Sequence, residues 1–494
     1  MKGHSVAAGA VLAATVNAAT PEGVVQWNIG KRQPHPRAIR RSVTNTDQIT
    51  ISNNVSSGGY FAECEVGTPA QTLTLQLDTG SSDTWLPASN ASVCSTSRHS
   101  TSSGCSLGSF DSSSSSTFSI VNSDFSIQYV DGSESVGDYF TDVFVIGGST
   151  ISNLTMGLGL TTDISFGLVG VGYASNEAIV GTEDSFSAEY ANLPVALVNS
   201  GIIKSRAYSL WLNDLDASTG NILFGGIDTE KYDGELTSID IYKDSSSETF
   251  TSFIVALTSV NASSSSGTDL LTSREFPISV VLDSGTTLSY VPNDLAAQIW
   301  TEVGAVYSSD VGAAVIPCSK AGGDGVLSFG FAGPGGPVIN VTMDELVLGI
   351  GSATFTSGEY KGETACEFGI QNMTGDPYML GDTFLRSAYV VYDLVNNQIG
   401  IAPTKFNATA TNIVAFTSSG AAIPSATTAP HQDQVTSATS YTTPGYAASS
   451  GFSSSDSSSS SSKNSGASSL VTRDALRVAL TGTAMFLTGG LLML

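Results

Sequence analysis

Leu75-Gln76-Leu77-Asp78-Thr79-Gly80-Ser81-Ser82 and Val280-Val281-Leu282-Asp283-Ser284-Gly285-Thr286-Thr287 are two copies of one short motif in a chain of 494 residues. In each copy an apolar segment leads into an aspartate, a hydroxyl residue, a glycine and two further hydroxyl residues. In the first copy Leu73, Leu75 and Leu77 alternate with polar residues, which is the period of a half-buried β-strand. A loop that occurs twice, about one lobe apart, indicates an internal repeat in which each half contributes one carboxylate.

Paired aspartates suit one kind of hydrolysis. Two carboxylates held about 3 Å apart cannot both ionise, so they share one proton. One can then accept a proton from water while the other donates a proton to a carbonyl oxygen, which cleaves a peptide bond without a metal or a covalent intermediate. We therefore expect Asp78 and Asp283 to be a catalytic pair. A single Asp-Thr-Gly is usually an ordinary turn, but two copies with matching flanks rarely arise by chance.

Six flanking residues are expected to support the pair: Thr79, Gly80, Ser81, Ser284, Gly285 and Thr286. The glycine of each copy permits a sharp turn and a close approach of the two loops. The hydroxyl residue before each glycine can hydrogen-bond across the junction of the lobes. The hydroxyl residue after it can donate to the outer carboxylate oxygen and so favour the charged form.

Further motifs surround both loops in order from Gly58 to Pro403. They are Gly67-Thr68-Pro69, Trp85-Leu86-Pro87, Phe110-Asp111, Ser115-Ser116-Thr117-Phe118, Gly170-Val171-Gly172, Gly225-Gly226-Ile227-Asp228, Leu380-Gly381-Asp382-Thr383-Phe384-Leu385-Arg386 and Tyr392-Asp393. Together they resemble the pepsin-like aspartic protease family, and more closely its fungal GPI-anchored members of the yapsin and candidapepsin type. The resemblance implies an all-β, bilobal fold with few short helices and pseudo-two-fold related lobes. It also implies an endopeptidase that acts at acidic pH, and it departs from the family pattern at Phe166-Gly167.

A hairpin over the active site is part of what the resemblance implies. Its tyrosine matches Tyr129 in Ile127-Gln128-Tyr129-Val130-Asp131-Gly132-Ser133, where Asp-Gly is a strong hairpin-turn signal. By likeness to the family, Tyr129 hydrogen-bonds Trp85 and covers the substrate. Asp131 stands where fungal relatives carry an acidic residue that favours a basic side chain at P1, so we expect a tolerance or preference for Lys or Arg there. The alternatives are an ordinary strand aromatic at Tyr129 and an exposed turn residue at Asp131.

The five cysteines predict two disulfides and one free thiol. Cys94–Cys105 would close a short loop, which resembles the disulfide-closed insertion of yapsin-like proteins, and Cys318–Cys366 would close a larger one. Cys64 alternates with acidic residues in a strand-like segment, so we expect it to be a buried thiol; the alternative is a reactive one. A second local prediction is a helix near Asn293 to Val303, because Leu295, Ile299, Trp300 and Val303 fall on one face.

Charge and residue inventory exclude several classes of function. The net charge of −25 and a pI of about 4.2 argue against nucleic acid as a partner. They suit a protein that works in acid, and simple solubility remains an alternative explanation. The four histidines are His4, His35, His99 and His431, and none is well placed as a catalytic base. No His/Cys cluster has zinc spacing and no loop has a phosphate-binding pattern, so we expect no metal and no cofactor.

The N-terminal residues are expected to be removed from the mature protein. Residues 1–18 contain Lys2, an apolar run and small residues for cleavage, which predicts a signal peptide. Residues 19–41 are rich in Pro, Lys and Arg and hold the dibasic pairs Lys31-Arg32 and Arg40-Arg41, which predicts a propeptide; a solvated basic linker is the alternative. The two catalytic lobes are then expected at residues 42–226 and 227–407.

The C-terminus reads as a surface attachment. Residues 408–469 are mostly Ser, Thr, Ala and Pro and predict an O-glycosylated stalk without enough apolar surface to fold. Residues 470–494 end in an apolar tail and, with the small residues near Asn464, match a GPI attachment signal; a tail-anchored membrane helix is the alternative. Seven N-x-Ser/Thr sequons support secretion: Asn54, Asn90, Asn153, Asn261, Asn340, Asn372 and Asn407.

The sequence thus predicts a monomeric, secreted aspartic endopeptidase that cleaves polypeptides at the outer face of the plasma membrane or in the cell wall. It would be made as a zymogen and held at the membrane by a GPI anchor, with partial shedding as an option. The rival prediction is a catalytically silent wall or adhesion protein of the same fold. The intact aspartates and hydroxyl residues of both loops favour the enzyme.

Overall fold

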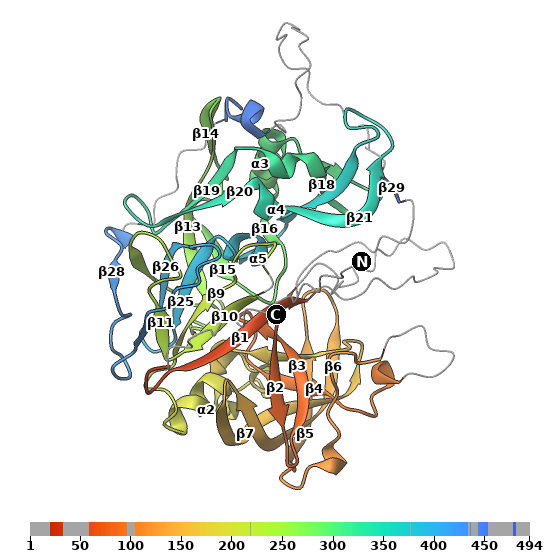
Figure 1. Ribbon diagram of the computed structural model, residues 1–494, viewed down its shortest axis with the longest axis vertical. Coiled ribbons are helices and arrows are strands. Elements are labelled where there is room, and N and C mark those ends of the chain that lie inside the picture. Colours follow the sequence, from red (N-terminus) through yellow and green to blue (C-terminus); the bar gives the residue numbers. More distant parts are fainter. Residues whose placement is uncertain are drawn as a thin grey trace, which may run out of the picture.

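The computed structural model shows a mostly β molecule with two lobes, one above the other in Figure 1. It describes residues 20–32, 59–95, 104–217, 219–375, 377–432, 435 and 443–452, and the backbone of 478–480. Strands β2 to β7 build the lower lobe and strands β13 to β21 build much of the upper one, while β1 runs where the lobes meet (Figure 1). The predicted all-β, bilobal class is confirmed.

The alternation read from the sequence produces these strands. In β2 (Gly59–Val66), Cys64 and Val66 are buried while Glu63 and Glu65 are exposed. Successive side chains of a strand point to opposite faces, so the apolar set enters the core and the acidic set meets water. β3 (Gln71–Asp78) is buried from Leu73 to its end because it is covered on both faces. The chain therefore enters the first Asp loop from the middle of the core.

The first half of the chain contributes twelve described strands. They are β1 (Val25–Arg32), β2, β3, β4 (Thr84–Pro87), β5 (Ser119–Gln128), β6 (Glu134–Ile146), β7 (Ser149–Thr162), β8 (Gly167–Gly170), β9 (Ala207–Trp211), β10 (Thr219–Phe224), β11 (Gly226–Asp228) and β12 (Leu236–Asp240). One large sheet has the order β28-β12-β26-β25-β9-β10-β1-β2-β3-β8-β4-β7-β6-β5. This sheet carries strands of both lobes and so joins them.

The second half builds two further sheets and closes the large one. Its strands are β13 (Ile254–Ser264), β14 (Gly267–Leu271), β15 (Ile278–Leu282), β16 (Ser289–Pro292), β17 (Val306–Ser308), β18 (Ala313–Pro317), β19 (Val326–Phe331), β20 (Val338–Thr342), β21 (Val347–Phe355), β22 (Thr364–Phe368), β23 (Ile370–Met373), β24 (Tyr378–Leu380), β25 (Ala388–Asp393), β26 (Gln398–Pro403), β27 (Ile413–Ala415), β28 (Ala426–Thr428) and β29 (Val478–Leu480). One sheet has the order β20-β19-β13-β15-β24-β16-β23, with β14 paired to β13, and another β17-β18-β22-β21-β29.

Both halves repeat one strand arrangement around their Asp loop. β3 runs parallel to β8, and β4, which follows the first loop, runs antiparallel to the same β8. In the second half β15 runs parallel to β24, and β16, which follows the second loop, runs antiparallel to β24. Each aspartate thus stands at the end of a buried parallel strand, with the chain returning on the far side of that strand's partner. The repeat seen in the sequence is a repeat of topology.

Helices are few and short: α1 (Ala178–Glu183), α2 (Leu193–Asn199), α3 (Asn293–Val303), α4 (Met343–Leu346) and α5 (Asp382–Leu385). The helix predicted at residues 293–303 is confirmed as α3. Its residues Leu295, Ile299 and Val303 are fully buried, and Trp300 donates its indole N–H to the carbonyl of Ile370 at 2.9 Å. Gly304 ends α3 in the left-handed region, with a φ of 78° that favours glycine.

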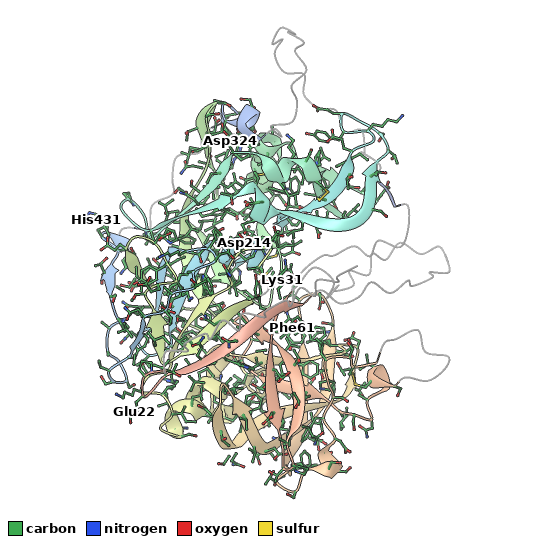
Figure 2. All side chains as sticks on the ribbon, in the orientation of Figure 1. Glu22, Lys31, Phe61, Asp214, Asp324 and His431 are labelled. Carbon is green, nitrogen blue, oxygen red and sulfur yellow. A yellow bond between two sulfur atoms is a disulfide. The ribbon has the colours of Figure 1, made fainter. Side chains whose placement is uncertain are left out.

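Two stretches at the ends belong to the folded part. β1, inside the predicted propeptide, is hydrogen-bonded between β10 and β2 and buries Trp27 and Ile29. Lys31 of β1 lies near the meeting of the lobes (Figure 2) and donates to the carbonyl of Leu215 at 3.1 Å.

At the other end the fold runs past the lobe boundary predicted at residue 407. β27 pairs with β11, β28 pairs in parallel with β12, and Phe416 between them is fully buried. Residues 443–452 dock on β13 and β14, where Phe452 is also fully buried. A few apolar side chains fix this Ser/Thr-rich sequence to the folded lobes. The prediction of a stalk from residue 408 rested on average composition, which does not show these single residues. The rest of the predicted stalk and the apolar tail lie outside the described residues, except the backbone of β29.

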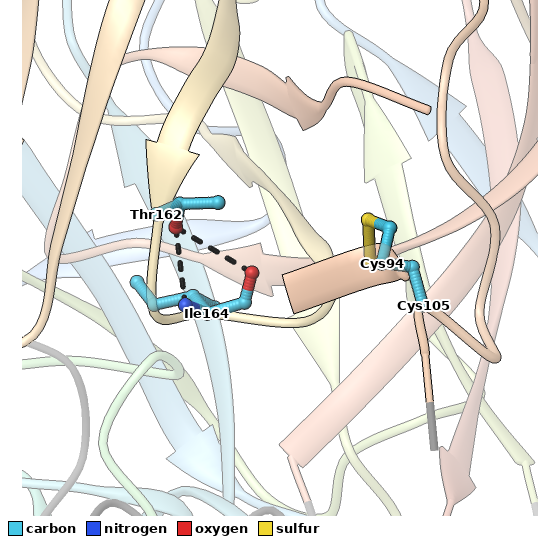
Figure 3. The surroundings of a disulfide bond; sticks show 4 residues. All are labelled: Cys94, Cys105, Thr162 and Ile164. Atoms are coloured by element: carbon cyan, nitrogen blue, oxygen red, sulfur yellow. Dashed lines mark hydrogen bonds between the residues drawn. A yellow bond between two sulfur atoms is a disulfide. The ribbon is translucent and has the colours of Figure 1, made fainter. Parts of the chain in front are cut away.

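The structure contains both disulfides named from the sequence. Cys94 and Cys105 are joined across 11 residues (Figure 3), and Cys318 and Cys366 across 48. The same view shows the turn that ends β7, where the hydroxyl of Thr162 accepts the backbone N–H of Ile164 at 3.0 Å. Cys64 is a buried free thiol, and burial raises its pKa far above the ordinary range, so it is held as a neutral side chain.

Two negative findings concern the described residues alone. Within them, no helix is both long and apolar enough to cross a membrane. Within the same ranges, no group of three or more His, Cys, Asp or Glu side chains is arranged to hold a metal ion.

Candidate active site

The two Asp loops meet face to face, each glycine lying against the other loop's carboxylate. A Cβ added to Gly80 would lie 2.6 Å from Oδ1 of Asp283, and one added to Gly285 would lie 2.3 Å from Oδ1 of Asp78. Both distances are well inside ordinary contact, so only a residue without a side chain fits at either place. The sequence prediction that these glycines permit close approach therefore has a direct steric basis.

A reciprocal set of hydrogen bonds locks the loops together. The hydroxyl of Thr79 donates to the carbonyl of Leu282 at 3.0 Å and accepts the backbone N–H of Ser284 at 2.9 Å. In return the hydroxyl of Ser284 donates to the carbonyl of Leu77 at 3.1 Å and accepts the N–H of Thr79 at 3.3 Å. All of these groups are buried, where hydrogen bonds are least exchangeable with water. The loops are fixed relative to one another by four bonds that obey the pseudo-two-fold symmetry.

Each of the two facing carboxylates also has the same two donors from its own loop. Oδ1 of Asp78 accepts the N–H of Gly80 at 2.8 Å, and its Oδ2 accepts the hydroxyl of Ser81. Oδ1 of Asp283 accepts the N–H of Gly285 at 2.8 Å, and its Oδ2 accepts the hydroxyl of Thr286. The sequence predicted these outer hydroxyl donors. They favour the charged form of each carboxyl group and hold its plane in a fixed orientation.

Burial and mutual charge oppose full ionisation of the pair. Both aspartates are fully buried. Burial, followed by the negative charge of Asp283, raises the pKa of Asp78 well above its ordinary value. Burial also raises the pKa of Asp283, against the lowering effect of its hydrogen bond with Thr286. The two groups interact strongly, so the titration belongs to the pair, which retains one proton over a pH range where isolated carboxyls have lost theirs.

The hairpin predicted as a flap joins β5 to β6. Its turn is closed by two backbone bonds, from the N–H of Tyr129 to the carbonyl of Ser133 at 2.9 Å and from the N–H of Gly132 to the carbonyl of Tyr129 at 2.8 Å. The indole N–H of Trp85 donates to the hydroxyl of Tyr129 at 2.8 Å. Trp85 follows the first Asp loop directly, so this bond connects the hairpin to the Asp loop of the same lobe.

Asp131 stands at the turn of the hairpin. Its Oδ1 accepts both the backbone N–H and the hydroxyl of Ser133, at 2.9 and 2.6 Å. Its Oδ2 is buried and has no hydrogen-bond partner. Half of this carboxylate therefore organises the turn, and the other half lacks a donor.

One buried carboxylate near the site was missed in the sequence. Asp83, five residues after Asp78, is fully buried and accepts three hydrogen bonds, from the hydroxyls of Tyr139 and Tyr190 and the N–H of Ala178. The available signal was an acidic residue between a buried loop and a fully buried strand, a place that costs free energy unless donors surround the charge. Nothing in the local sequence identified those donors, because they come from segments 56 to 107 residues away.

A bilobal, mostly β fold whose two Asp loops meet at the junction of the lobes defines the aspartic endopeptidases. Comparison with known proteins agrees. The family model for eukaryotic aspartyl proteases matches residues 59–404. The chain is 44% identical over 394 residues to the "Probable aspartic-type endopeptidase opsB" of Aspergillus fumigatus, covering 80% of this chain and 78% of that protein. The chain therefore belongs to the pepsin-like aspartic protease family and is an aspartic-type endopeptidase.

Two other relatives support the resemblance to yapsins and candidapepsins. Aspartic proteinase 3 of Saccharomyces cerevisiae is 34% identical over 472 residues, covering 82% of this chain and 79% of that protein. Candidapepsin of Candida tropicalis is 34% identical over 376 residues, covering 76% of this chain and 86% of that protein. The family expected from the motifs is confirmed.

Proposed function

We propose that this protein is a secreted, cell-surface endopeptidase in which Asp78 and Asp283 activate water at acidic pH. The observation that carries the proposal is the contact between the loops, which is so close that a Cβ added to the glycine of either loop would lie within 3 Å of the carboxylate of the other. Such contact is needed for two carboxylates to share a proton. A fold retained only for adhesion has no need of it.

In the proposed reaction an extended polypeptide binds beneath the flap. The ionised carboxylate of the pair accepts a proton from water as the water attacks the peptide carbonyl carbon, and the protonated one donates its proton to the carbonyl oxygen. The outer hydroxyls of Ser81 and Thr286 hold the two carboxyl planes in position throughout. The bonds between Thr79 and Ser284 keep the distance between the carboxylates fixed, so no rearrangement is needed as charge develops.

The direct test is cleavage of casein by the recombinant ectodomain at acidic pH, with and without pepstatin. We expect cleavage that pepstatin abolishes, and its loss in Asp78→Asn, which keeps the shape of the side chain but cannot share the proton. A wild-type protein without pepstatin-sensitive cleavage would leave the silent adhesion protein as the better proposal. Activity that survives in Asp78→Asn would contradict the mechanism.

The proposed specificity includes a basic P1 residue held by Asp131. Its unpartnered Oδ2 supports this, because a Lys or Arg side chain could supply the missing donor. The experiment is peptide-library profiling of the wild type and of Asp131→Asn. We expect the share of Lys and Arg at P1 to fall while cleavage after apolar residues continues. An unchanged P1 profile would reduce Asp131 to a turn residue.

We propose that residues 1–18 are a signal peptide and residues 19–41 a propeptide removed near Arg41. β1 lies inside this segment and is hydrogen-bonded on both sides, so cutting the chain does not by itself release it. N-terminal sequencing and intact mass of the secreted protein would test the cleavage site. They would also show whether residues 20–32 remain bound after cleavage.

Attachment to the cell surface is proposed through a GPI anchor after a short Ser/Thr-rich stalk. Among the sequons in the described residues, Asn90, Asn153, Asn340, Asn372 and Asn407 are exposed, which a glycan requires, and Asn261 is half-buried. Asn54 lies outside the described residues. Release of the protein from cells by phosphatidylinositol-specific phospholipase C, and its mass shift after glycan removal, are the tests. A protein that stays with the membrane after the lipase treatment would favour a membrane helix instead.

A further inference from the structure

Asp83 hydrogen-bonds two segments beside the flap, one with Tyr139 and one with Ala178 and Tyr190, and so connects both to the first Asp loop. Its Oδ1 accepts the hydroxyls of Tyr139 and Tyr190, both at 2.8 Å, and its Oδ2 accepts the backbone N–H of Ala178 at 2.7 Å. Tyr139 belongs to β6, the second strand of the flap hairpin, and Ala178 begins α1. All three donors are neutral. The side chain is fully buried, so each lost donor would leave an acceptor without water to replace it.

The segment that carries α1 holds the catalytic loop at further points. The side-chain amide of Asn176 donates to the carbonyl of Gly80 at 3.3 Å. The side-chain amide of Asn192 donates to the carbonyls of Ser82 and Gly172, at 3.4 and 3.1 Å. The loop from residue 78 to 83 is thus clamped along its length by residues 176–192. Asp83 hydrogen-bonds both this segment and the flap hairpin, the latter through Tyr139.

A row of aromatic rings continues from Asp83 to the flap tyrosine. The ring of Tyr139 packs edge-on against Phe125 of β5 with centroids 5.3 Å apart, and Phe125 packs against Trp85 at 6.2 Å. Trp85 then donates its hydrogen bond to Tyr129. These rings belong to a buried cluster separate from the main core. On β7, Gly157 leaves the space that Phe125 fills, since a Cβ there would lie 2.6 Å from its ring. Because these rings are closely packed, a shift of Tyr139 would displace Phe125 and, through it, Trp85 and Tyr129.

We propose that Asp83 is a positioning residue that fixes, through Tyr139 and α1, the position of the flap in which Tyr129 meets Trp85. It touches neither the catalytic carboxylates nor the flap tip. Its effect on the reaction runs through the place at which Tyr129 meets Trp85. The proposal rests on the peptidase activity described above, and it adds a determinant of substrate binding that lies behind the site.

Asp83→Asn is the informative variant because it keeps the shape and breaks the pattern of donors and acceptors. If the amide NH₂ takes the place of Oδ2, it faces the N–H of Ala178, and two donors cannot hydrogen-bond each other. If it takes the place of Oδ1, the hydroxyls of Tyr139 and Tyr190 must turn to accept instead of donate. In either orientation at least one of the hydrogen bonds made by Asp83 is lost or reversed. Since the catalytic pair is untouched, we expect KM for a peptide substrate and Ki for pepstatin to rise together, about tenfold, with kcat changed less than about threefold.

Two tyrosine variants and one carboxylate variant complete the experiment. Tyr139→Phe removes only the bond to the flap strand, and we expect the same direction of change in KM and Ki at a smaller size. Tyr190→Phe removes the other hydroxyl and should change KM less, because Tyr190 is not on the hairpin. Asp228→Asn is the matched control. Asp228 is a buried carboxylate with three donors, the N–H groups of Glu230 and Asn412 and the hydroxyl of Thr411, in another part of the molecule.

The outcomes separate positioning from mere stabilisation. We expect Asp228→Asn to lower the melting temperature and to leave KM and Ki unchanged below it. If Asp83→Asn behaves like Asp228→Asn, Asp83 is structural and the proposal is wrong. A fall in kcat at constant KM would also overturn it, because that result places the effect in the catalytic loop instead of the flap. If Asp83→Asn does not fold, Tyr139→Phe decides. A wild type without pepstatin-sensitive cleavage contradicts the proposed function, and this inference falls with it, whereas an active wild type whose Asp83→Asn variant keeps KM and Ki contradicts this inference alone.

Discussion

Replacing Gly285 by alanine puts a methyl group where the Asp78 carboxylate now lies. The new Cβ would be 2.3 Å from Oδ1 and 2.7 Å from Cγ of Asp78. Ordinary contact begins at 3.4 Å, so the Asp78 carboxylate or the two loops must shift by about 1.1 Å (3.4 − 2.3). For Gly80→Ala, with Oδ1 of Asp283 at 2.6 Å, the same estimate is about 0.8 Å (3.4 − 2.6). Neither glycine has a positive φ, so the backbone itself accepts alanine and the effect is steric.

A displacement of this size acts on catalysis more than on folding. Misplacing reacting groups by about 1 Å can lower a rate by about a hundredfold, because attack and proton transfer depend steeply on distance. We therefore expect kcat to fall about a hundredfold in Gly285→Ala and somewhat less in Gly80→Ala. The assay is the steady-state cleavage of a fluorogenic peptide at acidic pH, with circular dichroism and thermal unfolding to show that each variant is folded.

Gly349→Ala is the control for a glycine-to-alanine change in a strand. Gly349 lies on β21, has no positive φ, and nothing lies within 4 Å of its added Cβ. Its kcat and KM should equal those of the wild type. A Gly285→Ala enzyme with near wild-type kcat would refute the reasoning, since it would mean that the carboxylates work without the close contact of the loops.

Three further predictions concern stability. A chain ending at residue 407 loses Phe416, whose burial alone is worth about 2 kcal/mol, so denaturant unfolding should show a lower free energy of unfolding than a chain ending at residue 452. Glu302→Gln should flatten the decline of stability between pH 4.5 and 7, because burial raises the pKa of Glu302 from 4.5 to about 7, and thermal melts across that range are the check. Replacing Cys318 and Cys366 by serine opens a loop of 48 residues and should lower the free energy of unfolding by about 4 kcal/mol; an unchanged denaturation midpoint would contradict the loop-entropy estimate.

The sequence predicted what depends on local spacing and on the repeat. The strand before each aspartate, the glycine that follows it and the hydroxyls on either side are set within eight residues, so the loops could be derived one at a time. α3 was predicted with the bounds that the structure shows, since its apolar face repeats at the helical period. The contact of Tyr129 with Trp85 came from resemblance to the family. Nothing in the spacing of these residues gives it.

What the sequence did not predict is held by contacts between distant and weakly patterned segments. The stretch after residue 407 is polar on average, and its place in the fold depends on Phe416, on Phe452 and on strand pairing with β11 and β12. β1 lies in the segment assigned to a propeptide by its Pro, Lys and Arg content and its dibasic pairs, although the alternation of Trp27 and Ile29 with polar residues already had the period of a strand. An average of composition over a stretch of sequence does not show a single buried apolar residue. The position of such a residue can be recognised only when the surface that it packs against is known.

The structure also bears on why the chain is so acidic. Several carboxyls away from the catalytic pair are buried, and burial raises the pKa of Asp83, Glu177, Glu302, Glu367 and Asp382. A carboxyl whose pKa is higher in the folded than in the unfolded state binds its proton more tightly when folded. Its contribution to stability is therefore complete below the unfolded pKa and is lost as the pH rises through the folded value, which for Glu302 is the interval from 4.5 to about 7. Surface carboxylates add repulsion over the same rise in pH. Solubility alone would require only the exposed acidic residues. We expect the buried ones to add stability in acid, where Asp78 and Asp283 are expected to share one proton.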